Sequence, residues 1–210
     1  MVAEESMPGH GVGSDRILTV PNAITVGRLC LLPVFLWLLF VQEDRASAAG
    51  LLAALGTTDF LDGYIARRFN QVSDLGKVLD PVADRLLFFV GVGGILIVGS
   101  VPVWFAVAVL IREALVAGAT LALAALGAKR IDVTWYGKAG TFFLMIALPL
   151  FLASESTVGW ADQAETLAWL AGIPGLVLSW YAALLYVPLA RQALRDGRAE
   201  NAGPRVPSAS

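Results

Sequence analysis

Four aspartates between positions 59 and 84 are the residues of this sequence best suited to chemistry. The first two are three residues apart and the last two are four apart, so each pair would share one face of a helix. Uncharged segments, residues 50–58 and 86–98, border the cluster on both sides. Carboxylates gathered at the edge of an apolar segment repel one another strongly unless a cation neutralises them. The residues concerned are Asp59, Asp62, Asp80 and Asp84.

The ligand chemistry and the neighbours of these aspartates indicate a site for metal and phosphate. An all-oxygen site favours Mg²⁺ or Mn²⁺ over zinc, and four carboxylates leave room for two ions that clamp a transferring phosphate. Gly63 and Gly76 remove side chains where a ligand would approach, and Arg67 can present a bidentate donor pair to a phosphate. The alternative is that the acids are ordinary helix-end charges and that Arg67 is a membrane-surface anchor.

The composition indicates a membrane protein. Hydrophobic residues make up 57% of the chain and charged residues 15%, with a mean hydropathy of +0.71. Soluble domains are roughly 45–50% apolar and about 25% charged. The single cysteine, Cys30, excludes an internal disulfide, and the single histidine, His10, argues against histidine-dependent catalysis or zinc binding.

Six apolar segments come close to the roughly 20 residues that a helix needs to cross about 30 Å of hydrocarbon. The alternating pattern of barrel strands is absent, so helices are expected. We therefore predict an all-α polytopic membrane protein with six transmembrane helices, preceded by a short interfacial helix within residues 14–22. The predicted spans are residues 24–41, 46–65, 81–98, 102–126, 135–153 and 167–189.

The distribution of basic residues predicts the orientation in the membrane. Lysines and arginines gather in the N-terminal segment, after the second and fourth spans, and in the C-terminal segment, whereas the opposite loops carry Arg45 and otherwise acids. By the positive-inside rule, both termini and the aspartate cluster would face the cytoplasm. We predict a flexible leader (1–14), a membrane domain (15–190) and a disordered cytoplasmic tail (191–210).

The residues from 59 to 84 also match a long family signature. The string D-x2-D-G-x2-A-R-x8-G-x3-D-x3-D is present with every fixed position filled. Residues 18–25, Arg28 and Pro33 resemble the entry to the first span in the branch that makes glycerophospholipids. On these residues the chain resembles the CDP-alcohol phosphotransferase family over about residues 16–190. The branch contains phosphatidylglycerophosphate synthases and CMP-forming cardiolipin synthases.

This resemblance implies a reaction in which an acceptor hydroxyl attacks the lipid-side phosphate of CDP-diacylglycerol and CMP leaves. By the same resemblance, Asp59, Asp62 and Asp80 would hold two divalent cations, Mg²⁺ or Mn²⁺. Asp84 would complete the metal site and act as the general base. It further implies a homodimer in the bacterial plasma membrane with its active site facing the cytoplasm, and no nucleic acid among the partners. The residues that would form the CDP pocket are Asp59, Gly63, Ala66, Arg67 and Gly76.

The choice of acceptor depends on cations that this chain lacks. Phosphatidylglycerophosphate synthases lead one to expect arginine at position 120 and lysine at position 140, where this chain has Thr120 and Gly140. Without these two cations, the dianionic phosphate of glycerol 3-phosphate loses more binding energy than the phosphodiester of phosphatidylglycerol does. Residues 70–73 and 133–142 also resemble actinobacterial cardiolipin synthases. We therefore predict phosphatidylglycerol as the acceptor, with glycerol 3-phosphate as the alternative.

Asn22, Arg112 and Lys138 are further candidates for contact with the acceptor. Arg112 and Glu113 are charged near the middle of the fourth predicted span, so Arg112 either belongs to a buried ion-paired network or meets a substrate phosphate. Asn22, like Arg28, fits either an anchoring or a binding role. A small transporter is the main non-enzyme alternative. Acids at one membrane face and the lack of a matching second half disfavour it.

Overall fold

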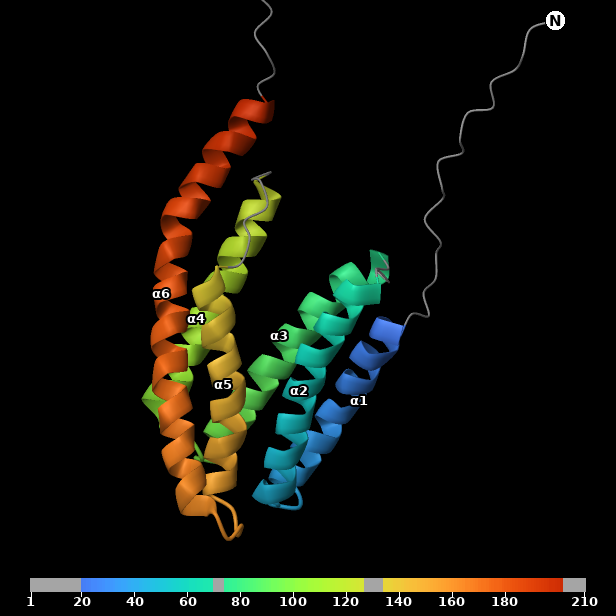
Figure 1. Ribbon diagram of the computed structural model, residues 1–210, viewed down its shortest axis with the longest axis vertical. Helices are drawn as coiled ribbons and strands as arrows, with labels where there is room; N and C mark the ends of the chain where they lie inside the picture. The colour runs from blue at the N-terminus through green and yellow to red at the C-terminus, as the bar shows by residue number, and fades with distance from the viewer. Residues whose placement is uncertain (1–19, 70–73, 127–133, 202–210) are drawn as a thin grey trace, which may run out of the picture.

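The computed structural model of the chain is built from helices. It describes the backbone of residues 20–69, 74–126 and 134–201, and the side chains of 24–58, 83–123, 125–126 and 134–189. No strand occurs within these ranges, so the prediction of an all-α fold is confirmed (Figure 1). The helices are α1 (Val20–Phe40), α2 (Arg45–Phe69), α3 (Asp74–Ile97), α4 (Val103–Ala125), α5 (Trp135–Ser154) and α6 (Ala161–Asn201).

Each of the six predicted apolar segments falls on one of these helices. Three described segments are long and apolar enough to cross a membrane: Val103–Leu123, Trp135–Ser154 and Ala161–Leu189. The chain is therefore a helical membrane protein, and the crossing of all six helices stays a prediction. The predicted interfacial helix and the leader fall almost entirely on residues 1–19, outside the described part of the chain.

Helices α3 and α6 extend furthest beyond the apolar segments from which we predicted them. Helix α3 begins at Asp74, seven residues before the expected start, so Asp80 and Asp84 lie inside the helix rather than in its first turn. Helix α6 continues to Asn201, past the boundary predicted at residue 190. The added residues of α6 are mostly alanine, arginine, leucine and glutamate, which favour a helix in water as well as in lipid. The rest of the predicted tail, residues 202–210, lies outside the description.

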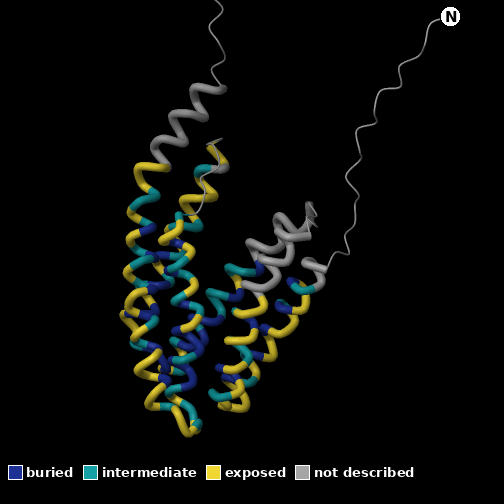
Figure 2. The backbone as a smooth tube through the Cα atoms, in the orientation of Figure 1, coloured by how far each residue is buried: buried dark blue, intermediate teal, exposed yellow. Residues whose placement is uncertain are grey.

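The helices converge at the end that holds the three turns α1–α2, α3–α4 and α5–α6, and they separate toward the other end (Figure 1). Among the residues whose burial the structure describes, most of the buried ones lie in the convergent half (Figure 2). All six helices contribute to this core. Its largest side chains are Phe35, Leu39, Ile95, Phe105, Leu144, Phe151 and Leu152.

Helices α5 and α6 approach each other most closely where glycines leave room. A Cβ atom at Gly140 would lie 2.7 Å from the backbone nitrogen of Ser179, and one at Gly175 would lie 3.0 Å from the backbone nitrogen of Leu144. The first distance is too short for a real Cβ atom and the second is tighter than most real contacts, so these helices pack backbone against backbone. Gly140 stands at one of the two positions where a phosphatidylglycerophosphate synthase would be expected to carry a cation. Helix packing leaves no room for a side chain at this position.

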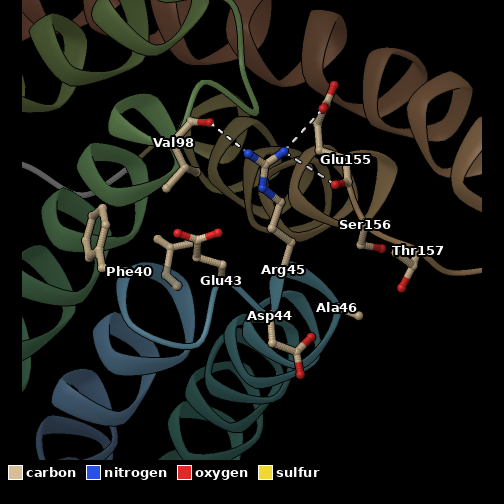
Figure 3. Close-up of a pocket in the computed structure, with 10 residues that line it drawn as sticks. Phe40, Glu43, Asp44, Arg45, Ala46, Val98, Glu155, Ser156 and Thr157 are labelled. Atoms are coloured by element: carbon tan, nitrogen blue, oxygen red, sulfur yellow. Dashed lines mark hydrogen bonds and ion pairs between the residues drawn. The ribbon is translucent and has the colours of Figure 1, made fainter.

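The turn end is held together by polar contacts. Asp44 caps the start of α2 by accepting a hydrogen bond of 3.0 Å from the backbone N–H of Ser47. Hydrogen bonds from the side chain and backbone of Ser47 hold the pKa of Asp44 below its ordinary value. Arg45 donates to the carbonyl oxygen of Val98 and to Glu155 across a cavity of about 530 Å³ (Figure 3). These contacts join the α1–α2 turn to the ends of α3 and α5.

Candidate active site

Helices α2 and α3 bring the two aspartate pairs to the same end of the bundle. Asp59 and Asp62 lie in the second half of α2, and Asp80 and Asp84 lie in the first half of α3 (Figure 1). Among the neighbouring residues, Leu55 of α2, Leu87 of α3 and Leu32 of α1 form one buried cluster.

This leucine cluster places the backbones of Asp59 and Asp84 at a similar level along the bundle. Asp59 follows Leu55 by four residues, and Asp84 precedes Leu87 by three. One helical turn spans 3.6 residues, so both aspartates lie about one turn beyond the contact between their helices. The arrangement of the backbone thus fits the predicted convergence of the carboxylates. The side chains of Asp59, Asp62 and Asp80 lie outside the description, as do those of Gly63, Ala66, Arg67 and Gly76.

Asp84 is the signature residue whose side chain the structure describes. Its Oδ1 lies 2.6 Å from Nη1 of Arg28 on α1, in an ion pair with a charge-assisted hydrogen bond. The Arg28 side chain is 4% exposed, whereas that of Asp84 is 44% exposed. A buried arginine therefore orients the carboxylate while leaving part of it open to a substrate.

The contact between Arg28 and Asp84 was not predicted from the sequence, in which Arg28 fitted either an anchoring or a binding role. One signal was present: Arg28 is the single charged residue among residues 24–41. A charge inside an apolar span needs a partner, and Asp84, 56 positions later, supplies it.

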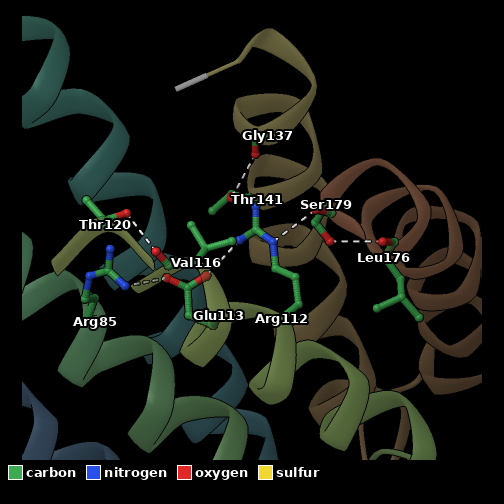
Figure 4. Close-up of polar contacts among 9 residues, drawn as sticks. All are labelled: Arg85, Arg112, Glu113, Val116, Thr120, Gly137, Thr141, Leu176 and Ser179. Carbon is green, nitrogen blue, oxygen red and sulfur yellow. Dashed lines mark hydrogen bonds and ion pairs between the residues drawn. The ribbon is translucent and has the colours of Figure 1, made fainter. Parts of the chain in front are cut away.

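A second polar network lies between α3, α4 and α6 (Figure 4). Oε2 of Glu113 is 2.8 Å from Nη1 of Arg112, and its Oε1 is 3.4 Å from Nη1 of Arg85. Arg112 also donates from Nε to the carbonyl oxygen of Ser179 at 3.2 Å. The buried ion-paired network, one of the two alternatives for Arg112, is therefore present. Contact of Arg112 with an acceptor stays a prediction.

The structure does not connect the other predicted acceptor residues to Arg112. Lys138 is exposed in the first turn of α5, and no contact between it and Arg112 occurs among the described side chains. Asn22 lies in the first turn of α1, and its side chain is outside the description. Thr120 is exposed on α4, with its hydroxyl donating to the carbonyl oxygen of Val116 at 2.7 Å. The structure thus leaves position 120 open to solvent or lipid, unlike position 140.

An apolar groove of about 480 Å³ runs between α2 and α5. Its α2 side consists of small residues on one helix face, and larger side chains such as Phe142 and Met145 form the α5 side. Thr57, at one end of the groove, lies two residues before Asp59. The groove therefore leads from the turn end of the bundle to the level of the aspartate pairs. The small residues are Ala46, Ala49, Gly50, Ala53, Gly56 and Thr57.

The donor set of the signature fits hard divalent cations. Carboxylate oxygens are the ligands that Mg²⁺ and Mn²⁺ prefer, and the signature supplies four of them. No group of three possible metal ligands occurs among the described side chains, which include only Asp84 of the four aspartates. Metal binding by these residues therefore stays a prediction that rests on donor chemistry.

Comparison with known proteins supports the family resemblance. The model of the family described as CDP-alcohol phosphatidyltransferase matches residues 18–189. The chain is 39% identical to a protein of Streptomyces coelicolor named cardiolipin synthase (CMP-forming), over 88% of each chain. It is 35% identical to a putative cardiolipin synthase of Mycobacterium tuberculosis, over 91% of this chain and 96% of the relative.

A third relative carries the name of the alternative activity. The chain is 34% identical to a probable phosphatidylglycerophosphate synthase of Mycobacterium tuberculosis, over 72% of this chain and 74% of the relative. Both names fall within the branch that the signature and the first-span residues indicated. The match covers all six helices except the last part of α6. This chain belongs to the CDP-alcohol phosphatidyltransferase family.

Proposed function

We propose that this protein is a membrane phospholipid synthase that makes cardiolipin from CDP-diacylglycerol and phosphatidylglycerol and releases CMP. The observation that carries the proposal is the complete signature on α2 and α3 in a chain 39% identical, over 88% of its length, to a CMP-forming cardiolipin synthase. Membership of a transferase family disfavours the transporter alternative.

The proposed step is the transfer of a phosphatidyl group between two oxygens. The acceptor hydroxyl oxygen forms a bond to the lipid-side phosphorus of CDP-diacylglycerol, and the bond from that phosphorus to the oxygen of CMP breaks. Asp84 accepts the proton of the hydroxyl as the general base. Its partly exposed carboxylate and its 2.6 Å contact with buried Arg28 support this role, because the base must be accessible and fixed in orientation.

The remaining signature residues would bind the nucleotide end of the substrate. Asp59, Asp62, Asp80 and Asp84 would hold two divalent cations, Mg²⁺ or Mn²⁺, whose charge stabilises the phosphates during transfer. Arg67 would add a bidentate donor pair to a phosphate. The small residues Gly63, Ala66 and Gly76 would leave room for the CDP group.

Phosphatidylglycerol is the proposed acceptor because the site is short of cations for a phosphomonoester. Position 140 cannot hold a lysine side chain, since a Cβ atom there would collide with the backbone of α6. Position 120 holds a threonine whose hydroxyl donates a hydrogen bond to a backbone carbonyl oxygen of its own helix. Glycerol 3-phosphate remains the alternative acceptor, and Asn22, Arg112 and Lys138 are the residues proposed to meet either one.

The membrane arrangement is part of the proposal. All six helices would cross the bacterial plasma membrane, with both termini and the active site on the cytoplasmic side and two chains forming a homodimer. The basic residues near the aspartate end support this orientation. A lipid acceptor would enter sideways from the bilayer, and the groove between α2 and α5 offers an apolar wall for acyl chains.

The test is the release of CMP by the purified full-length protein with CDP-diacylglycerol and Mn²⁺. Phosphatidylglycerol and glycerol 3-phosphate would be supplied in separate reactions, and the lipid products identified. Cardiolipin should form with phosphatidylglycerol, and glycerol 3-phosphate should be the poorer acceptor. Release of CMP with glycerol 3-phosphate alone would reverse the assignment of the acceptor, and release with neither would contradict the reaction class.

A further inference from the structure

One carboxylate in the bundle interior holds two arginines. Glu113 of α4 contacts Arg112 of the same helix at 2.8 Å through one oxygen and Arg85 of α3 at 3.4 Å through the other (Figure 4). The Glu113 side chain is 16% exposed. Electrostatic interactions between charges that are screened so little by water are strong. Glu113 therefore controls how much positive charge this part of the molecule presents.

The two arginines are held to different degrees. Arg112 is buried, and its Nε is fixed by the carbonyl oxygen of Ser179 on α6. Arg85 is 35% exposed, and its contact with Glu113 is long enough to be released at small cost. Arg85 can therefore turn toward an anion while Arg112 remains in place.

Arg85 also lies beside the reaction chemistry. It follows Asp84 directly in α3. Successive helix residues point about 100° apart, and these two contact opposite neighbours: Asp84 pairs with Arg28 of α1, and Arg85 pairs with Glu113 of α4. The Glu113 network thus lies one residue from the proposed general base, on the α4 side.

The charge of the network suits a phosphodiester. Two arginines and one glutamate carry a net charge of +1. A phosphodiester such as phosphatidylglycerol carries one negative charge, whereas a phosphomonoester carries about −1.5 to −2 at neutral pH. Neither Thr120 nor Gly140 adds a cation nearby. The neutralising effect of Glu113 therefore lowers the attraction for a phosphomonoester more than for a phosphodiester.

We propose that Glu113 is a positioning residue that sets acceptor specificity, because it orients Arg112 and Arg85 and neutralises one of their two charges. This inference rests on the proposed function, since it concerns the acceptor of the same reaction. Glu113 itself touches no substrate in this scheme. Its effect reaches the acceptor through the two arginines.

The test measures kcat/KM for phosphatidylglycerol and for glycerol 3-phosphate in the wild type and in Glu113→Gln. The variant keeps the shape of the side chain and removes its charge, which leaves a net charge of +2. The ratio of the two values should shift toward glycerol 3-phosphate by about tenfold, the size expected for a contact to a charged group. Glu113→Asp, which keeps the charge, should restore most of the wild-type ratio.

A matched control removes a different ion-paired glutamate. Glu155→Gln breaks the contact with Arg45 at the turn end and should leave the acceptor ratio unchanged. A purely structural role of Glu113 would lower both kcat/KM values equally, and this result, with CDP affinity intact, would overturn the inference. A wild type that releases no CMP with either acceptor would overturn the proposed function and the inference together.

A second variant decides the question if Glu113→Gln does not fold, as judged by loss of CDP binding. Arg85→Gln removes the more exposed cation and makes the network neutral. It should raise the KM for phosphatidylglycerol about tenfold while the affinity for CDP changes little. An unchanged KM in this variant would overturn the inference as well.

Discussion

Two arginine–glutamate contacts in this molecule have the same chemistry and different surroundings. At the turn end, Arg45 lies 3.3 Å from Glu155, with the two side chains 33% and 54% exposed (Figure 3). In the interior, Arg112 lies 2.8 Å from Glu113, with the two side chains 7% and 16% exposed (Figure 4). The first contact is long and solvated, and the second is short and largely dry.

The difference indicates separate roles for the two regions. Arg45 also donates to the backbone carbonyl oxygens of Val98 and Glu155, so it ties together the ends of helices. A buried ion pair is often no more stabilising than apolar side chains of the same size. Fold stability alone therefore gives no reason for the Glu113 network, whereas anionic substrates give one. Under the proposed function, the convergent end would serve the fold, and the divergent end would serve the reaction.

Loss of the general base should have the largest effect and test the functional end directly. Asp84→Asn keeps the shape of the side chain but cannot accept the proton or form the ion pair with Arg28. We expect turnover to fall by about 10²–10⁴-fold, measured as CMP release. Glu155→Gln at the turn end serves as the control and should keep its activity. A near-normal rate in Asp84→Asn would mean that Asp84 is not the base.

Loss of a predicted metal ligand should have the second-largest effect, and it should appear in the affinity for CDP rather than in turnover. Asp59→Ala removes one of four carboxylates and should weaken the Mn²⁺-dependent binding of CDP by tenfold or more, about 1.4 kcal/mol. Calorimetric titration with and without Mn²⁺ measures this effect. Asp162→Ala, an exposed acid in the first turn of α6, is the matched control. Equal CDP affinities in the wild type and Asp59→Ala would argue against metal binding by Asp59.

Much of the fold could be predicted from the sequence because lipid imposes a simple pattern. Apolar segments of about 20 residues must become helices, and all six predicted segments do so. The ends of α3 and α6 could not be predicted in this way. Helical residues that extend beyond the apolar part of a span carry no hydrophobic signal. The continuation of α6 to Asn201 was therefore not predicted.

The part of the candidate site whose residues are close in sequence could be predicted. The contacts between residues on different helices could not. The signature lies within 26 residues, and its spacing can be read directly. The contact between Arg28 and Asp84 joins residues 56 positions apart, and the contact between Arg85 and Glu113 joins residues 28 apart. Such pairs depend on which helices are neighbours. The closure of position 140 by the α6 backbone depends on helix packing in the same way.

Addition of a cation near Glu113 should change the acceptor preference, with a smaller effect than the two substitutions above. Thr120→Arg places a charge two turns beyond Glu113 on α4, at an exposed position that can hold a long side chain. We expect kcat/KM for glycerol 3-phosphate to rise by up to about tenfold, the value of one contact to a charged group. Ala119→Arg adds the same charge on a different face and should have little effect. Equal gains in both variants would indicate a nonspecific surface effect.

The smallest effect is expected at the turn end, and it should appear in stability rather than in activity. Arg45→Gln removes the contact with Glu155 and weakens the hydrogen bonds to the two carbonyl groups. Because both side chains are substantially exposed, we expect a loss of no more than about 1 kcal/mol in the free energy of unfolding. Arg112→Gln should cost more, up to about 3–5 kcal/mol, because it leaves the largely buried Glu113 without its closest partner. Thermal unfolding in the same detergent, together with CMP release, would measure both variants. If Arg45→Gln lowers acceptor turnover as strongly as Arg112→Gln does, the division of the bundle into a structural end and a functional end is wrong.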